Sequence, residues 1–302
     1  MNYVSCNLCG AEAWDVRYAS THHGARQPEV SIFQCTSAEY GDHAQIVQCR
    51  QCGLVYANPR WTPTEVLDAY ASVEDELYVA ERAGRELTFR RHLQHLEKFT
   101  GPGDGRALLD VGAYIGVFVE VAQAAGWEAY GVEPSRWGVQ AARARGLRVY
   151  EGTLATPEVQ AGQFDVITMW DVVEHFDDPS AELGRALTLL KPGGLLAVHT
   201  MNVQSWMARL MGRRWPWLMS MHIYYFSPHT LAQMLRQAGF EIVWSGAQGR
   251  YLRLGYLATR LAGLSRPLGQ LAERLIRRVG LGEVAVPVNF GDLFTVYAIR
   301  PK

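Results

Sequence analysis

The chain has 302 residues, of which 48% are hydrophobic, and its acidic and basic side chains nearly balance to a net charge of −1. This composition predicts a globular protein with a sizeable core, and it argues against a general affinity for nucleic acid, which needs a surplus of Lys and Arg. The sequence has no apolar run as long as a membrane span and no export signal at its start, so we expect a cytoplasmic protein without a transmembrane segment.

Four of the five cysteines form two C-x-x-C pairs, which predict a metal site. The pairs are Cys6 with Cys9 and Cys49 with Cys52, and a glycine follows the second cysteine of each pair. Each pair places two thiolates at one tight turn, and two such turns complete a tetrahedral zinc site. Such spacing fits a reducing compartment better than a disulfide framework does.

Residues 1–62 are therefore interpreted as a small zinc-ribbon module. Strands are predicted around residues 14–18, 30–34 and 45–48. We expect zinc to fold the module, because it is too small for a core of its own; the alternative is recognition of a nucleic acid or a partner. Cys35 is expected to be a small buried residue, and the weaker candidates for the ligand set are His22, His23 and His43.

Residues 63–104 are predicted to form a helical linker or cover. Thr62 as cap and Pro63 as first helical residue indicate a helix start, and a long polar and aromatic helix is predicted over residues 74–99. The basic residues expected on a solvated face of this helix are Arg82, Arg90, Arg91, His92 and His95. In the alternative, the helix covers a ligand cleft and offers a cation to a substrate carboxylate or phosphate.

From residue 105 onward, strands and helices alternate, which predicts an α/β fold with a mainly parallel sheet. Residues 108–135 give a short apolar strand, a turn with Gly112 and Gly116, a helix, and a second strand that ends at Glu133. The glycines let the backbone approach a ligand at the helix N-terminus, and the carboxylate can accept hydrogen bonds from ribose hydroxyls. Nicotinamide dehydrogenases and S-adenosylmethionine (SAM) methyltransferases share this pattern.

Two later blocks distinguish between these classes. Residues 164–175 form a strand that runs into a polar and aromatic turn, and residues 189–199 form a helix end, a Pro-Gly-Gly break and another strand. In this order and spacing, the three blocks resemble the class I SAM-dependent methyltransferases over roughly residues 105–245. The resemblance implies a seven-stranded doubly wound methyltransferase sheet, whose remaining strands are placed at 147–150, 241–246 and 293–299, the last one antiparallel.

The resemblance also implies which residues bind SAM. Asp110, Gly112 and Gly116 would hold the methionine and ribose side, and Glu133 the ribose hydroxyls. The residues placed around the adenosine are Thr153, Leu154, Trp170 and Asp171. The family usually has a glycine where Tyr114 stands, so this tyrosine changes the shape of the methionine end or packs over the ligand. Each of these residues could instead be structural.

Methyl transfer to an oxygen or nitrogen needs an in-line arrangement and a general base for the proton. His175 and His222 are the candidate bases, because histidine can hold a proton near neutral pH; the alternative is that each is structural. Between them, residues 201–217 contain three tryptophans beside Arg213 and Arg214. We interpret this segment either as a lid that stacks on a sugar or aromatic acceptor or as an apolar cover of the core.

The last domain, residues 105–302, carries a helical insertion at about residues 250–281. Residues 250–278 hold seven arginines against one acid, interspersed with leucines, which predicts a basic amphipathic helical pair. We expect it to pack on the chain itself or on a second subunit in a homodimer. The alternative is peripheral contact with an anionic membrane surface.

The whole layout resembles a narrower group, the bacterial methyltransferases of glycan, nucleotide-sugar and natural-product pathways. The likeness rests on the ribbon ending in CGLVYANPR, the class I core and the H-x-Y-Y-F-S-P helix start at residues 222–228; the core is also similar to the ubiquinone-biosynthesis-type subfamily. It implies SAM-dependent methyl transfer to a small-molecule or glycan-type acceptor, at oxygen. The alternatives are a zinc-ribbon RNA methyltransferase, a nicotinamide-dependent reductase and a non-catalytic partner subunit.

Overall fold

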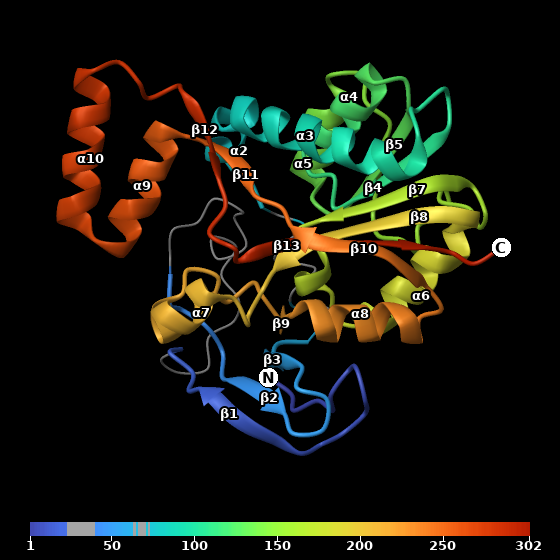
Figure 1. Ribbon diagram of the computed structural model, residues 1–302, viewed down its shortest axis with the longest axis horizontal. Helices are drawn as coiled ribbons and strands as arrows, with labels where there is room; N and C mark the ends of the chain where they lie inside the picture. The colour runs from blue at the N-terminus through green and yellow to red at the C-terminus, as the bar shows by residue number, and fades with distance from the viewer. Residues whose placement is uncertain (23–39, 63–64, 66–70, 72) are drawn as a thin grey trace.

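A seven-stranded sheet is the centre of the computed structural model, which describes residues 1–22, 40–62, 65, 71 and 73–302 (Figure 1). The sheet order is β10-β13-β8-β7-β4-β5-β6. Its strands are β4 (Ala107–Val111), β5 (Glu128–Glu133), β6 (Val149–Glu151), β7 (Phe164–Trp170), β8 (Leu190–Met201), β10 (Glu241–Ala247) and β13 (Leu293–Ile299). The first five are parallel, and β13 enters antiparallel between β8 and β10. The predicted doubly wound methyltransferase sheet is confirmed.

Helices cover both faces of this sheet (Figure 1). On one side lie α3 (Arg82–Thr100), α4 (Val117–Ala124) and α5 (Arg136–Arg143), and on the other α6 (Pro179–Leu189) and α8 (Pro228–Gln237). Because successive strand residues point to opposite faces, Leu108 packs in the same cluster as Phe118 of α4, whereas Leu109 packs with Leu183 and Leu231. The burial of both faces explains why these strands are short and continuously apolar.

Two details of the sheet differ from the prediction. The third strand begins at Val149, not at residue 147. The Pro-Gly-Gly stretch, predicted as a break before the fifth strand, lies inside β8 as a bulge, because Phe164 pairs with Leu190 while Val166 pairs with Leu195. A bulge accommodates the proline, which has no N–H for the ladder.

The N-terminal module forms a second, antiparallel sheet. Its order is β1-β2-β3-β9, with β1 (Trp14–Tyr18), β2 (Ile46–Cys49), β3 (Val55–Ala57) and β9 (Tyr224–Tyr225). The predicted strands near 14–18 and 45–48 are thus present, while residues 30–34, Cys35 and His23 lie outside the described residues. The last strand comes from the large domain, and Arg60 adds a hydrogen bond of 2.8 Å to the Tyr224 hydroxyl. The N-terminal sheet is therefore paired with a strand of the large domain that lies close to His222 in the sequence.

The predicted helix over residues 74–99 is two helices, α2 (Glu76–Ala80) and α3, which meet at Glu81. The buried Glu81 carboxylate accepts hydrogen bonds from Arg253, a residue far along the chain. The expectation of a solvated face holds for Arg90 and Arg91 but is wrong for His92, which is only 3% exposed and lies 3.0 Å from the Gly249 carbonyl. The predicted start at Pro63 lies outside the described residues.

The insertion projects from one end of the sheet as a helical hairpin (Figure 1). The short strands β11 (Arg250–Arg253) and β12 (Ala285–Val288) pair antiparallel at its base, and α9 (Leu254–Leu264) and α10 (Arg266–Arg278) form the two arms. The expected packing of this pair on its own domain is not seen for α10, whose leucines are exposed. Within the described part of the chain, every helix is too short or too polar to cross a bilayer.

Candidate active site

A cavity of about 970 Å³ lies at the carboxyl ends of the parallel strands. This is where doubly wound folds bind their ligands, because the strand order reverses there and the crossing helices leave a crevice. Of the residues predicted to bind SAM, those that line the cavity are Gly112, Tyr114, Thr153, Leu154, Trp170 and Asp171. Both predicted bases, His175 and His222, line it as well. This volume lies near the upper end of the range of about 300–1,000 Å³ that is typical of small-molecule sites.

The turn after β4 requires glycine at both predicted positions. Gly112 and Gly116 have left-handed φ angles of 69° and 76°. A Cβ atom on Gly112 would lie 2.6 Å from a methyl group of Val172, which real contacts do not allow. Asp110, just before the turn, is buried, and its carboxyl accepts a 2.7 Å hydrogen bond from Thr168. Burial raises the pKa of Asp110 to about 8, although the Thr168 hydroxyl opposes this.

Glu133 ends β5 as predicted, and its side chain is fully buried. Its two oxygens accept hydrogen bonds of 2.9 Å from the Tyr114 amide and 2.7 Å from the Ser135 amide. Burial raises the pKa of Glu133 to about 7, against the effect of these two bonds. The hydroxyl of Ser135, two residues after Glu133, donates to the Val73 carbonyl at 3.2 Å, so the segment before α2 closes over this corner.

Tyr114 takes the place of the family glycine with a φ of 47°, which is rare for a bulky residue. Its buried ring meets the ring of Tyr78 edge to face at 4.6 Å between centroids and lies 5.5 Å from the ring of Trp137. The tyrosine therefore packs between α2 and α5 while still lining the cavity. Its ring fills space that a glycine would leave open.

A buried polar cluster lies where β7 and β8 end. Arg250 donates to both carboxylate oxygens of Asp171 at 3.0 Å, and its guanidinium lies 5.2 Å from the ring centre of Trp217. The Nε2 atom of His199 is 3.7 Å from the same carboxylate. Burial alone would raise the pKa of Asp171, but the charge of Arg250 holds it below its usual value. Asp171 therefore stays ionised in the cavity wall.

Sequence reasoning missed three members of this wall. His92, His199 and Arg250 come from α3, β8 and β11, and the rings of the two histidines lie 5.1 Å apart. His92 lies on α3, and the alternative prediction for this helix was that it covers a ligand cleft, as it does. His199 and Arg250 belong to a strand and an insertion for which no role in the site was predicted. Only the contacts between these distant segments bring the three side chains together, so no local sequence motif reveals them.

The two predicted bases come together at the cavity. His175 ends the short 3₁₀ turn η2 (Val173–His175), His222 lies just before β9, and their ring centroids are 4.9 Å apart. The Nδ1 atoms face the carbonyls of Met221 at 2.8 Å and Trp217 at 2.7 Å. A carbonyl can only accept, so each Nδ1 carries the proton and each Nε2 keeps a lone pair. Burial lowers the pKa of both rings, that of His222 to about 3, so both are neutral bases near pH 7.

Glu174, which was not among the predicted site residues, completes this group. Its buried carboxyl accepts a 2.9 Å hydrogen bond from Thr200, and burial, with the charge of Asp171 adding to it, raises the pKa of Glu174 to about 8. One potential metal-ligand atom from each of Glu174, His175 and His222 lies within 4.8 Å of the other two. One carboxyl and two imidazoles at this spacing can pass a proton or hold a divalent cation.

The four predicted zinc ligands converge in the N-terminal module. Their sulfur atoms lie within 4.8 Å of one another, with Cys6 to Cys52 at 3.4 Å and Cys9 to Cys49 at 3.5 Å. In a tetrahedral site with zinc–sulfur bonds of about 2.3 Å, two sulfur atoms lie about 3.8 Å apart. These thiols therefore need little movement to bind zinc.

The backbone explains the glycine after each pair. Gly10 and Gly53 have φ angles of 73° and 77° and donate their N–H groups to the carbonyls of Cys6 and Cys49. Neither of the two alternative ligands within the described residues belongs to the cluster, because His22 lies 2.8 Å from the Ser220 hydroxyl and His43 lies 2.7 Å from the Ala44 carbonyl. The cluster therefore has four cysteines, as the spacing predicts.

Residues 81–245 match a family model described as a methyltransferase domain. This segment is more than half of the 302-residue chain and holds the glycine turn, Glu133 and both histidines. The chain belongs to this methyltransferase family. Together with the observed sheet order, the match confirms the predicted class I SAM-dependent methyltransferase fold and enzyme class.

Curated relatives of this methyltransferase include two ubiquinone biosynthesis O-methyltransferases. The one from Bordetella avium is 29% identical over 163 residues, which are 49% of this chain and 68% of the relative. The one from Cereibacter sphaeroides is 33% identical over 155 residues, 47% of this chain and 63% of the relative. A solved SAM-dependent methyltransferase from Archaeoglobus fulgidus shares the fold with a TM-score of 0.51 at 19% identity, covering 75% of this chain and all of that one.

Proposed function

We propose that this methyltransferase transfers a methyl group from SAM to an oxygen atom of a small-molecule or glycan-type acceptor. The observation that carries the proposal is a single cavity that is lined both by Gly112 of the glycine turn and by two neutral histidines. The named activity of the O-methyltransferase relatives supports oxygen as the methylated atom. SAM, when bound, supplies an electrophilic methyl group on a sulfonium.

The residues around β4, β5 and β7 would hold the cofactor. Gly112 and Tyr114 line the cavity where the methionine end would lie. Gly116 lets the turn pack closely against Leu147, and Asp110 supports the turn through Thr168. Thr153, Leu154 and Trp170 would enclose the adenosine, with Asp171 at its rim. Glu133 would accept the ribose hydrogen bonds with its remaining lone pairs. Because Glu133 is fully covered, part of the chain near Tyr114 or Val73 must shift for this contact.

The histidine pair would take the proton of the acceptor hydroxyl. Nε2 of either His175 or His222 offers the lone pair, while the carbonyls of Met221 and Trp217 fix the ring orientations. A base held in this way lowers the barrier for an oxygen nucleophile. The surrounding aromatic side chains exclude water, which would otherwise compete for the methyl group.

We also propose that Cys6, Cys9, Cys49 and Cys52 hold a structural zinc ion. Burial raises the pKa of Cys6 to about 11, so this thiol needs a cation to ionise near neutral pH. Two of the four, Cys6 and Cys49, are fully buried, which favours a structural site over a catalytic one that keeps an open position.

A transfer assay tests the proposed function. The protein is incubated with methyl-labelled SAM and a panel of hydroxyl-bearing acceptors that includes phenols, quinone precursors, sugars and nucleotide sugars. We expect label on a hydroxyl oxygen of one acceptor class, which mass spectrometry of the product localises. Transfer to RNA alone, or reduction of a substrate by NADH in place of methyl transfer, would contradict the proposal.

A further inference from the structure

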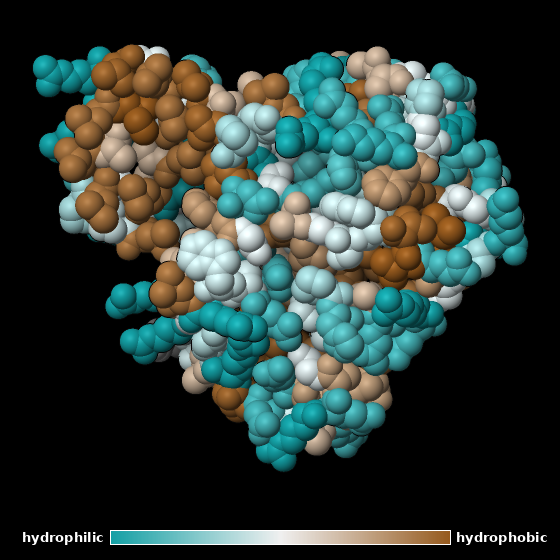
Figure 2. Space-filling model, in the orientation of Figure 1, coloured by the Kyte–Doolittle hydropathy of each residue, from teal (hydrophilic) through white to brown (hydrophobic). Residues whose placement is uncertain are grey.

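The α9–α10 hairpin presents a row of apolar side chains to solvent. On α10, Leu268, Leu271 and Leu275 are 56%, 55% and 55% exposed, and their spacing of three and four residues places them on one face. Leu264 at the end of α9 and Val279 after α10 are also exposed, and Figure 2 shows a hydrophobic surface over this part of the molecule. We call these five residues the hairpin stripe.

Small residues between the two helices explain why the leucines point outward. A Cβ atom on Gly269 would lie 2.3 Å from the Cα of Ala262, so the helices meet in backbone contact at this point. The buried Gly269 is the inner face of α10, and the leucines stand on the outer side. The hairpin thus forms without burying its largest apolar groups, which leaves them free for another surface.

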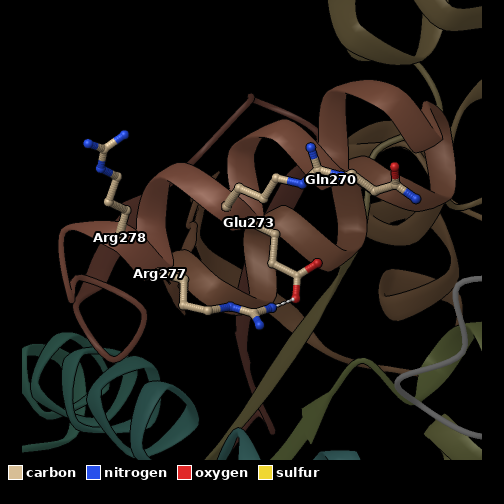
Figure 3. A pocket seen from close by; sticks show the side chains of 5 residues that line it. Gln270, Glu273, Arg277 and Arg278 are labelled. Carbon is tan, nitrogen blue, oxygen red and sulfur yellow. Dashed lines mark hydrogen bonds and ion pairs between the residues drawn. The ribbon is translucent and has the colours of Figure 1, made fainter.

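Positive charge borders the stripe. Helix α10 carries four arginines, Arg266, Arg274, Arg277 and Arg278, and one acid, Glu273, a local net charge of +3 (four minus one) in a chain whose total is −1. Figure 3 shows Arg277 paired with Glu273, while Arg278 points away from this pair. A helix with an exposed leucine face and a strongly basic polar face is typical of segments that lie in the interface of anionic membranes.

We propose that the hairpin stripe docks this methyltransferase on an anionic membrane surface. The arginines would contact lipid phosphates, and the leucines would enter the boundary between head groups and acyl chains. A second copy of the chain fits less well, because a symmetric pair would bring two sets of four arginines to one interface, where like charges oppose association.

The hairpin also connects this surface to the active-site cavity. Tyr256, Leu257, Leu261 and Leu264 of α9 line the cavity, and Leu264 belongs to the stripe as well. Docking through the stripe would therefore hold the cavity mouth at the lipid boundary. The docking itself does not depend on the proposed methyl transfer, so the two can fail separately.

Vesicle flotation with the full-length protein tests the proposal. The vesicles contain phosphatidylcholine alone or phosphatidylcholine with phosphatidylglycerol. Three proteins are compared with the wild type: Leu268→Gln/Leu271→Gln/Leu275→Gln, Arg274→Gln/Arg278→Gln, and the control Leu87→Gln. Leu87 is an exposed leucine of α3, 44% accessible, that lies outside the cavity wall. Circular dichroism and binding of S-adenosylhomocysteine (SAH) establish that each variant is folded.

We expect the wild type and the Leu87→Gln control to float with the anionic vesicles and to be released by salt. The triple leucine variant should bind at least about tenfold more weakly, and the arginine variant should lose its preference for anionic lipid. Absence of wild-type binding, or equal loss in the Leu87→Gln control, would overturn the proposal. So would sedimentation of the wild type as a dimer that the triple leucine variant converts to a monomer without any vesicle binding, because the partner would then be a second copy.

Discussion

At the scale of single residues, backbone carbonyls fix the tautomer and orientation of His175 and His222 at the cavity. Their Nδ1 protons are committed to the carbonyls of Met221 and Trp217, so only Nε2 is left to accept a proton. Burial lowers the pKa of both rings, so both are neutral near pH 7. Each ring therefore offers Nε2 as a proton acceptor, and its basicity is lower than that of a solvent-exposed histidine.

Replacing the base should reduce turnover while leaving cofactor binding intact. We expect His175→Asn or His222→Asn to lower kcat by about 10²–10⁴-fold, the range for loss of a general base. SAH affinity, measured by calorimetry, should change little. Because burial lowers the pKa of both rings, the acid limb of kcat/KM in the wild type should lie below the usual histidine pKa of about 6.5. Full activity in both variants would remove the histidines from the mechanism.

The neighbouring Glu174 gives a prediction for stability and pH. Burial raises its pKa from 4.5 to about 8, so the folded chain keeps a proton that the unfolded chain releases. Its stabilising contribution is complete below pH 4.5 and is lost as the pH rises through about 8. The unfolding free energy of the wild type should therefore fall relative to Glu174→Gln across this window. Urea denaturation of both proteins at several pH values measures the difference, and a constant difference would contradict the raised pKa.

At the scale of elements, the N-terminal ribbon and the large domain depend on each other. β9 completes the ribbon sheet through pairing with β3, and it follows His222 directly. Loss of the ribbon fold should therefore disturb one of the two candidate bases, although the metal cluster is not part of the cavity wall.

Removing one zinc ligand should reveal this dependence. We expect Cys49→Ser to abolish bound zinc, measured by mass spectrometry of the metal content, and to lower the melting temperature. Treatment of the wild type with a strong chelator should have the same effect. Cys35→Ser is the matched control, because Cys35 lacks the pair spacing of a ligand, and it should keep the bound zinc. Full zinc content in Cys49→Ser would exclude the four-cysteine site.

The elements also show how far the sequence alone could lead. The core strands and the turn at Gly112 and Gly116 could be predicted, because local periodicity and glycine geometry determine them. β9 could not, since a two-residue strand has no pattern of its own and exists only through β3. The break between α2 and α3 lies at Glu81, whose partner Arg253 comes from the distant insertion, so the local sequence does not reveal this contact. Burial of Glu133 likewise follows from how the turn at Tyr114 folds over it.

At the scale of the whole molecule, three parts of the chain meet at one cavity. The sheet supplies the turn and Asp171, the segment before β9 supplies His222, and the insertion supplies Arg250 and the outer wall from α9. The shared methyltransferase core, residues 81–245, holds the glycine turn, Asp171 and both histidines, whereas Arg250 and the cavity wall from α9 lie outside it. We expect cofactor binding to follow the family and acceptor choice to be particular to this chain.

The central claim is that SAM binds at the glycine turn with Glu133 beside its ribose. Isothermal titration calorimetry of the wild type, Glu133→Ala and the control Glu128→Ala with SAH and with NADH tests it most directly. We predict one SAH per wild-type chain, no heat from NADH, a loss of about 1.5–3 kcal/mol in Glu133→Ala and none in Glu128→Ala, which lies at the other end of β5. An unchanged SAH dissociation constant in Glu133→Ala, or binding of NADH in place of SAH, would contradict the account.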